Sequence, residues 1–209
     1  MGEGPGSAGA AEPDTREALL DTASAIMREG DIVDLSLSDL AARSGLNSAL
    51  VKYYFGNKAG LMTALLERDF ADILRAVDAL LGKDMDPEAK FRRHLKAVVD
   101  VFFKTPYVHR LLMRLIREGD AVESARLADA YLQPLLGAYE RLIGEGVAAG
   151  VFRPVDPLLF YFTVVGAADR FFSARLVLRH CTGSDVLDEG LRDRYRAHLQ
   201  DFVMAAILV

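Results

Sequence analysis

One short stretch, from Ser36 to Leu61, constrains the fold of this chain more than any other. Its first part has the start signal of a helix, because the Ser36 hydroxyl can accept hydrogen bonds from the first turn and Asp39 completes a capping box. The helix is predicted to end near Ser44, since Gly45 adopts the left-handed conformation at no steric cost. The stretch therefore begins with a short helix that a glycine turn closes.

A second short helix follows the glycine, with Asn47 or Ser48 as its cap. Helical spacing puts Leu50, Val51 and Tyr54 on its inner side. Two short helices joined in this way predict a helix-turn-helix, whose second helix reads the major groove of DNA. The alternative is a pair of ordinary core helices joined by a glycine turn. The outward-facing side chains of the second helix are those of Ser48, Ala49, Lys52 and Tyr53.

The same stretch resembles the tetracycline-repressor (TetR) family of transcriptional regulators. In that family a hydroxyl residue, an Asp and an Ile-Ala pair precede Ala-Gly-Val-Ser, and then Leu-Tyr, an aromatic, a Phe and a Ser-Lys pair follow. Ala49 replaces the usual Gly and Lys52 the usual Tyr, so the base preference of the family does not carry over. The residues that match the pattern are Ser36, Leu37, Asp39, Leu40, Ala41, Ser44, Gly45, Leu46, Asn47, Val51, Lys52, Tyr53, Tyr54, Phe55, Asn57 and Lys58.

The resemblance implies which side chains contact DNA. Lys52 could donate to O6 or N7 of a guanine, and Tyr53 could pack on a sugar or a thymine methyl. The alternative for Tyr54 is a place in the core. The family positions that face bases correspond to Ser48, Ala49, Lys52 and Tyr53. Those that hold phosphates correspond to Ser36, Tyr54 and Lys58.

Composition narrows the class of protein. The chain has 209 residues, a formal net charge of −5 and one cysteine, Cys181. One cysteine excludes an intrachain disulfide and every metal motif that needs several cysteines. No apolar run approaches the length of a membrane span, and the Gly- and Ala-rich N-terminus lacks the apolar core of a signal peptide. We therefore expect a cytoplasmic protein with no membrane partner, no metal site and no bound cofactor.

The acidic balance argues mildly against a nucleic-acid partner, which favours a basic face. The local balance is different. In the helix-turn-helix stretch, Arg43, Lys52 and Lys58 stand against a single acid, Asp39. A locally positive patch on an acidic protein suits a sequence-selective DNA-binding protein.

Helical periodicity, with no strand-like alternation and no internal repeat, predicts an all-α fold. Residues 1–12 are predicted to be a disordered tail, residues 13–57 a three-helix DNA-binding domain, and residues 58–209 a larger helical domain for effector binding and dimerisation. Pro134 predicts a kink or a boundary. Outside the helix-turn-helix, the predicted helices cover about residues 14–28, 57–81, 88–104, 105–119, 121–150 and 156–180, with a last helix after residue 185.

Enzyme motifs are missing from the sequence. It contains no Glu-x-x-His pair for a di-iron bundle, no Gly-rich phosphate loop and no Gly-x-Ser-x-Gly elbow. The histidines, His94, His109, His180 and His198, are scattered. The sequence indicates a binding protein that is not an enzyme.

A single DNA-binding head contacts too few base pairs for useful affinity, so two-fold pairing is expected. The last two predicted helices carry aromatic and small residues at helical spacing, which favours a dimer interface there. The alternative is that these faces bury only against their own domain. The candidate interface residues are Phe160, Val164, Ala167, Phe171 and Phe202.

The larger domain also carries apolar walls with interspersed polar groups, as small-molecule pockets do. The alternative is that the aromatic stripe is ordinary core. An adjacent Asp169-Arg170 pair in an apolar helix needs compensation, which a dimer partner or a ligand could provide. We expect an apolar ligand bearing one acidic or hydrogen-bonding group. The candidate pocket residues are Phe103, Tyr107, His109, Met113, Arg114, Phe162, Asp169 and Arg170.

Together, the motif and the resemblance predict a ligand-responsive transcriptional regulator. More specifically, we expect a repressor that binds a palindromic double-stranded DNA operator as a homodimer and is released by a small-molecule effector. The effector is expected to act by shifting the population of arrangements of the helix over residues 58–81. The alternatives are a helical protein-interaction module and a DNA-binding protein that responds to no small molecule.

Overall fold

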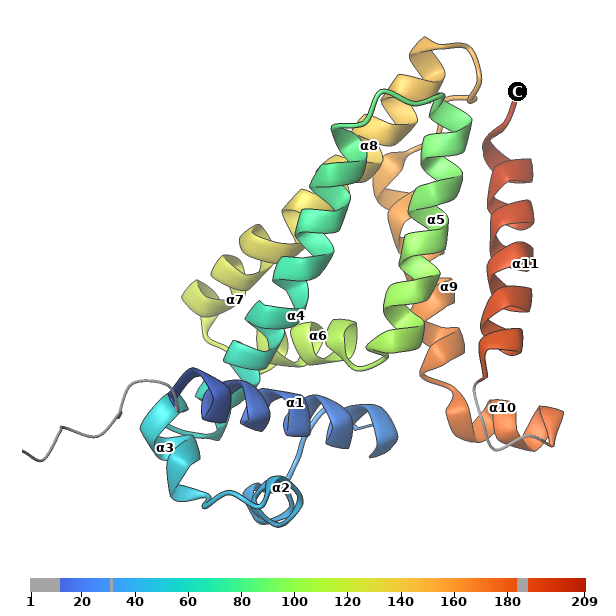
Figure 1. Cartoon of the computed structure of the whole chain (residues 1–209). Coiled ribbons are helices and arrows are strands. Elements are labelled where there is room, and N and C mark those ends of the chain that lie inside the picture. Colours follow the sequence, from blue (N-terminus) through green and yellow to red (C-terminus); the bar gives the residue numbers. More distant parts are fainter. Residues whose placement is uncertain (1–11, 31, 184–187) are drawn as a thin grey trace, which may run out of the picture. The chain divides into compact units, whose positions relative to one another are not determined.

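A computed structural model describes residues 12–30, 32–183 and 188–209. Almost all of the predicted tail, residues 1–12, lies outside them. The prediction of an all-α fold is confirmed, since the described residues form helices and one isolated antiparallel bridge between Phe152 and Leu208 (Figure 1). Among the same residues, no helix combines the length and the apolar character needed to cross a membrane. The chain divides into two compact units, a head that ends at Glu67 and a body that begins at Arg68.

The head contains α1 (Glu12–Gly30), α2 (Leu37–Ser44), α3 (Ala49–Phe55) and the beginning of α4 (Lys58–Leu81). Its end at Glu67 lies beyond the boundary predicted after residue 57. The reason is that the first turns of α4 carry apolar side chains that are buried, at Leu61, Met62, Leu65 and Leu66.

The turn between α2 and α3 has the predicted geometry. The Ser36 hydroxyl accepts from the N–H of Ser38 at 3.2 Å and from that of Asp39 at 3.5 Å, which caps α2. Gly45 has φ 70°, in the left-handed region, and its N–H donates to the carbonyl of Ala41 at 3.0 Å. A side chain at this position would be strained, so the glycine fixes where α2 ends.

Two further glycines, Gly56 and Gly60, shape the junction of α3 with α4. Gly56 closes α3 with φ 76°, and the Asn57 side chain caps α4 by accepting from the N–H of Gly60 at 2.9 Å. A Cβ on Gly60 would stand 2.0 Å from the carbonyl oxygen of Phe55. The first turn of α4 can therefore follow the end of α3 this closely only because residue 60 has no side chain.

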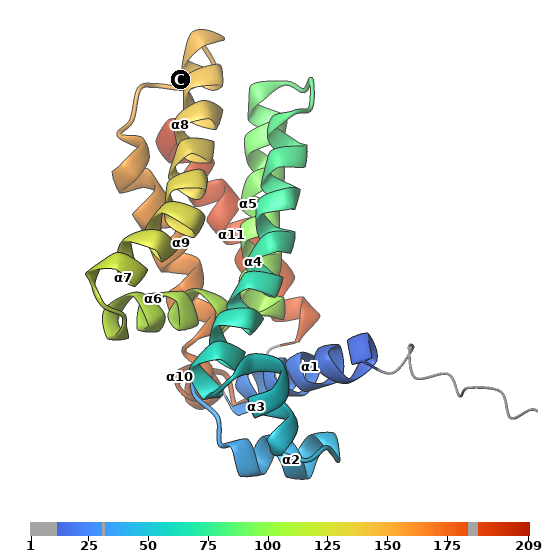
Figure 2. The same cartoon turned by 90° about the vertical axis from the view of Figure 1, so that its left-hand side faces the viewer.

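The body consists of the rest of α4 and the helices that follow it. Helix α5 packs against α11, α9 and α8, and α8 also packs against α9 (Figures 1 and 2). The elements are α5 (Pro87–Lys104), α6 (Val108–Glu118), α7 (Ala121–Leu127), a π-helical segment η1 (Ala128–Leu132), α8 (Gln133–Ala148), α9 (Pro157–Phe172), α10 (Arg175–Thr182) and α11 (Glu189–Ile207).

Two helical runs differ from the prediction. The run predicted over 156–180 breaks after Phe172. The Ala174 N–H donates to the carbonyl of Phe171 and the Ser173 hydroxyl to that of Arg170, so the regular helical pattern ends and α9 and α10 are separate. The boundary predicted near Pro134 takes the form of η1. There the N–H of Gln133 reaches the carbonyl of Ala128, five residues back, just before the proline that has no N–H to offer.

Aromatic rings fill the centre of the body. Phe91 of α5 meets Phe152 edge-on at 5.6 Å and Tyr139 of α8 at 6.2 Å between ring centroids. Phe152 lies on Gly146 of α8, where a Cβ would come within 1.9 Å of the ring. The loop that carries Phe152 is tied to the end of α11, because the Arg153 guanidinium donates to the carbonyl of Leu208 at 2.9 Å.

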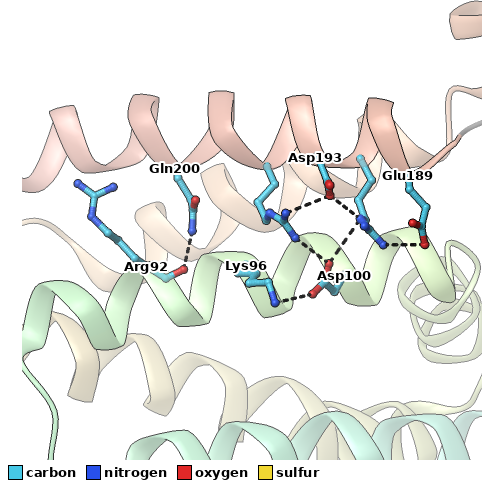
Figure 3. Close-up of polar contacts among 8 residues, drawn as sticks. Arg92, Lys96, Asp100, Glu189, Asp193 and Gln200 are labelled. Atoms are coloured by element: carbon cyan, nitrogen blue, oxygen red, sulfur yellow. Dashed lines mark hydrogen bonds and ion pairs between the residues drawn. The ribbon is translucent and has the colours of Figure 1, made fainter.

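A polar seam holds α11 along α5 (Figure 3). The carboxylate of Asp100 lies 4.0 Å from Arg192 and 3.7 Å from Arg196, and the Gln200 amide donates to the carbonyl of Arg92 at 2.8 Å. Each half-exposed ion pair contributes little, but the spacing of these contacts along the two helices fixes their register.

The contact between Gly146 and Phe152 leads to a test with a control on the same helix. Gly146→Ala should destabilise the protein by about 1–3 kcal/mol, because the added methyl has to displace the Phe152 ring. Gly144→Ala should instead stabilise it by roughly 0.5–1 kcal/mol, since nothing lies within 4 Å of a Cβ there and alanine favours the helix. Urea unfolding measures the change in the free energy of unfolding for both variants. A Gly146→Ala protein as stable as wild type would contradict the contact between Gly146 and Phe152.

Candidate nucleic-acid interface and ligand cavity

The outward face of α3 is the first candidate site. Val51 is buried, and one face of the short helix is thereby fixed toward the core of the head. The opposite side exposes the four side chains predicted to face bases, and Tyr53 is 69% exposed. Those four are Ser48, Ala49, Lys52 and Tyr53.

The cap of α3 decides between the two predicted candidates. The Asn47 side chain accepts from the N–H of Ala49 at 2.8 Å, whereas the Ser48 side chain makes no capping bond. Asn47 is therefore the residue that ends the turn. The Ser48 hydroxyl lies on the exposed surface beside Ala49 and Lys52.

The three residues predicted to hold phosphates have partners within the head. The Ser36 hydroxyl caps α2, and Lys58 forms an ion pair with Asp34 at 2.5 Å. Tyr54 is half-buried, and its ring meets that of Tyr53 edge-on at 4.8 Å. An exposed ion pair is worth little in water, so a phosphate could replace the carboxylate on Lys58 at small cost.

The positive patch of the head is smaller than the sequence indicates. Arg43 pairs with Glu29 at 2.5 Å, and its hydrogen bond holds the pKa of that carboxyl below the usual range. Lys58 is paired with Asp34. In the described part of the chain, Lys52 of α3 forms no ion pair, so its ammonium is the charge most available to an anionic partner.

A cavity in the body is the second candidate site. Its volume is about 90 Å³, and its walls are formed by five helices. The lining is almost wholly apolar. It comprises Phe70, Ile73, Ala76, Val77 and Leu80 of α4; His94, Ala97, Val98, Val101 and Phe102 of α5; Val108 and His109 of α6; Leu135 and Tyr139 of α8; and Tyr161 and Val165 of α9.

Four residues of the lining carry a buried polar atom without a hydrogen-bond partner. These atoms are Nε2 of His94, Nδ1 of His109 and the hydroxyl oxygens of Tyr139 and Tyr161. A buried polar group without a partner costs about 1–3 kcal/mol, and folded proteins leave few of them. Four such residues around one cavity are therefore an unusual concentration of unpaired polar groups.

Burial keeps three of these groups uncharged. It lowers the pKa of His94 to about 4 and raises the pKa of Tyr161 to about 12. The pKa of Tyr139 is raised further, first by burial and then by the neighbouring Tyr161. At neutral pH this wall of the cavity therefore offers neutral hydrogen-bonding groups, with no charge on the imidazole of His94.

Of the eight residues predicted to form the pocket, only His109 lines it. Phe103 and Phe162 miss it because helical residues turn by about 100° each, and the neighbours that line the cavity are Phe102 and Tyr161. Phe162 is instead 59% exposed. Asp169 lies beside the lining, with a carboxylate oxygen 3.7 Å from Nδ1 of His109.

The remaining pocket predictions are corrected in the same way. Tyr107 is fully buried and its hydroxyl donates to the carboxylate of Asp69 of α4 at 2.6 Å. Arg114 pairs with Glu118 along α6 at 2.8 Å. Each is outside the lining, as are Met113, which is half-buried, and Arg170, which is exposed.

One residue of the predicted dimer interface is not on the surface. Val164 is buried in the core of the body, because its side chain packs within its own domain. Phe171 is half-buried and stacks on Tyr195 of α11 at 3.9 Å, and Phe160 is half-buried. Ala167 is exposed, and Phe202 is 62% exposed.

The buried imidazole makes stability depend on pH. The pKa of His94 is about 4 in the folded chain and 6.5 when exposed, so the unfolded chain binds the extra proton first as pH falls. The uncharged imidazole therefore adds to the free energy of unfolding above pH 6.5, and this contribution, about 3 kcal/mol in total, is lost progressively as pH falls towards 4.

Urea unfolding at a series of pH values measures this loss. The difference between wild type and His94→Gln should change by that amount across the window, because glutamine does not titrate. His198→Gln, which alters an exposed histidine, should show no such change. If the free energy of unfolding of His94→Gln fell with decreasing pH as steeply as that of wild type, the acid sensitivity would arise from another group.

Comparison with known proteins identifies the family. The model described as bacterial regulatory proteins, tetR family, matches residues 19–65, and that described as tetracyclin repressor-like, C-terminal domain, matches residues 84–209. The transcriptional regulator BetI of Agrobacterium fabrum is 31% identical over 150 residues, which cover 70% of this chain and 68% of BetI.

Solved structures share the fold. The ketosteroid transcriptional regulator KstR2 of Mycobacterium tuberculosis has a TM-score of 0.72 at 17% identity, over 93% of this chain and 95% of its own. The regulator FadR of Bacillus subtilis, solved in complex with stearoyl-CoA, has a TM-score of 0.65 at 13% identity, over 90% and 97%. The helix-turn-helix, the body and these matches agree, and the chain belongs to the TetR family of transcriptional regulators.

Proposed function

We propose that this regulator is a repressor that binds a two-fold symmetric DNA operator as a homodimer and leaves it when a small molecule occupies the cavity of the body. The observation that carries the proposal is α4. One continuous helix begins in the head beside the DNA-reading motif and continues as a wall of the cavity, with Phe70, Ile73 and Val77 in the lining.

DNA reading is assigned to the exposed face of α3. A helix fits the major groove, where outward side chains meet base edges. Lys52 is the group best suited to select a base, since its ammonium is exposed and can donate to guanine. Ser36 and Lys58 lie at helix starts, where hydroxyl, ammonium and backbone N–H groups hold phosphates.

Dimerisation is assigned to α9 and α11. The outward side of α9 carries Leu159, which is 65% exposed, then Phe162 and the small Ala167. α11 adds Phe202, which is 62% exposed. A cluster of exposed apolar side chains of this kind is characteristic of a protein interface, and small residues let helices approach closely. Two heads held by one interface read two half-sites, as a palindromic operator requires.

Coupling is assigned to the start of α6. Val108 and His109 line the cavity, and the preceding residue, Tyr107, donates to Asp69 of α4 at 2.6 Å. A ligand that moves α6 therefore acts on α4 through one short hydrogen bond. A ligand that favours one arrangement of these helices shifts the population toward it, and the coupling to DNA is reciprocal.

The related proteins and the cavity favour this reading over its alternatives. A neighbour of the same fold, FadR of Bacillus subtilis, was solved with stearoyl-CoA, so a body of this architecture can hold a small molecule in that protein. The cavity, with four residues whose buried polar atoms have no partner, argues against the alternative of a DNA-binding protein that responds to no small molecule. The match to tetracyclin repressor-like domains supports repression as the outcome.

Selection of duplexes from a random library tests the DNA assignment. Selected duplexes should carry two inverted half-sites. Lys52→Ala should relax selection at one position of each half-site, with a loss of about 1–3 kcal/mol of discrimination. Lys58→Ala should weaken every duplex alike and flatten the salt dependence by about one charge per head.

Lys83→Ala provides the control, because this exposed lysine follows α4 in the body and should leave selection unchanged. If neither Lys52→Ala nor Lys58→Ala alters the selected sequences or the salt dependence, α3 and the start of α4 do not form the interface.

A further inference from the structure

The polar groups of the cavity gather in two places. The first group joins three helices, with the His94 ring 4.8 Å from that of Tyr139, and Tyr139 5.3 Å from Tyr161, both edge-on. Each member has one buried polar atom without a partner. His94 and the two tyrosines are therefore neighbours in the wall of the cavity and are here called the upper spot.

The second place lies at the start of α6. His109 meets the ring of Phe102 edge-on at 5.9 Å between centroids, and its Nδ1 has no hydrogen-bond partner. The Asp169 carboxylate oxygen 3.7 Å away is also without a hydrogen bond, but Asp169 is outside the lining. His109 is therefore a separate polar residue of the wall, here called the lower spot, and its Nδ1 lies on the side of Asp169.

The two spots are separated along the helices of the body. His94 and Phe102 are eight residues apart on α5, which corresponds to about 12 Å of helix. The wall between them is apolar, formed by Ala97, Val98 and Val101. The cavity is therefore long in the direction of α5, with hydrogen-bonding groups toward each end and hydrocarbon between.

No charged counterpart lines the cavity. Among the described residues, its lining contains no lysine, arginine, aspartate or glutamate. Arg114 and Arg170, which the sequence suggested as orienting groups for an acid, lie outside it. A charged ligand group would lose its hydration there without gaining an opposite charge, which is strongly unfavourable. A neutral hydroxyl or carbonyl would instead satisfy the unpaired groups.

From this geometry we infer that the effector is an elongated, uncharged, largely apolar molecule with a hydrogen-bonding oxygen near each end. One oxygen bonds the upper spot and the other reaches the lower spot, while the apolar stretch between them lies against α4 and α5. The inference rests on the proposed function in taking the cavity as the effector site, and it replaces the expected acidic group by a neutral one.

A matched set of ten-carbon compounds tests the charge requirement on the full-length protein, without DNA. Calorimetric titration at pH 7.5 compares decanediol with a hydroxyl on each terminal carbon, decanol with one hydroxyl, decanoate and decylammonium. Decanediol should bind tightest and decanol next, while the two ions should bind at least about tenfold more weakly than decanol, in line with the cost of burying an unpaired charge.

Two tyrosine variants test the site. Tyr161→Phe should weaken decanediol by roughly five- to tenfold, the effect of losing one hydrogen bond. It should fold normally, because the Tyr161 hydroxyl has no partner to lose in the protein. Tyr195→Phe, whose ring stacks on Phe171 outside the cavity, should leave the affinity unchanged.

The outcomes separate this inference from the function on which it rests. Binding of decanoate or decylammonium as tightly as decanol, equal affinities in Tyr161→Phe and wild type, or no binding by any member of the set would overturn the inference. Binding as expected, together with operator affinity indifferent to saturating decanediol, would uphold the ligand class and count only against the proposed response to ligand.

Discussion

A hydrogen bond between Tyr107 and Asp69 joins the start of α6 to α4. The Tyr107 hydroxyl donates to the Asp69 carboxylate at 2.6 Å, and Tyr107 is fully buried. It is followed directly by two cavity-lining residues, Val108 and His109, whereas Asp69 lies on the helix that continues from the head. A hydrogen bond of this length between a hydroxyl group and a carboxyl group is among the stronger contacts available to a protein. The start of α6, which lines the cavity, is therefore joined by this hydrogen bond to the helix that begins in the head.

The cavity is best understood through the polar atoms that it leaves unpaired. A fully apolar void would cost packing energy alone, but His94, Tyr139 and Tyr161 add the loss of hydrogen bonds to water. A sequence under selection for stability alone would place apolar side chains at these positions. The arrangement is consistent with a body whose packing is completed by a ligand, and with neutral groups whose pKa values burial keeps far from neutral pH.

The head could be predicted closely because its signals are local. Ser36, Gly45 and Asn47 each act on the backbone within four residues, so the caps and the turn follow from the sequence itself. The lining of the cavity could not be predicted from the sequence, because it depends on how five helices are rotated against one another. Phe102 and Phe103 are equally apolar in the sequence, yet only Phe102 faces the cavity, and the same holds for Tyr161 and Phe162. The contribution of α4 was missed as well, although Phe70, Ile73, Val77 and Leu80 repeat at helical spacing.

The coupling between the cavity and DNA is the central claim, and operator affinity with and without saturating decanediol tests it most directly. Wild type should lose about five- to 150-fold in operator affinity, the range of typical couplings. Tyr107→Phe, which removes the hydrogen bond to Asp69, should keep both binding activities and lose most of that response. An equal fall in operator affinity for Tyr107→Phe and wild type would contradict the account, because the signal would then reach DNA by another route.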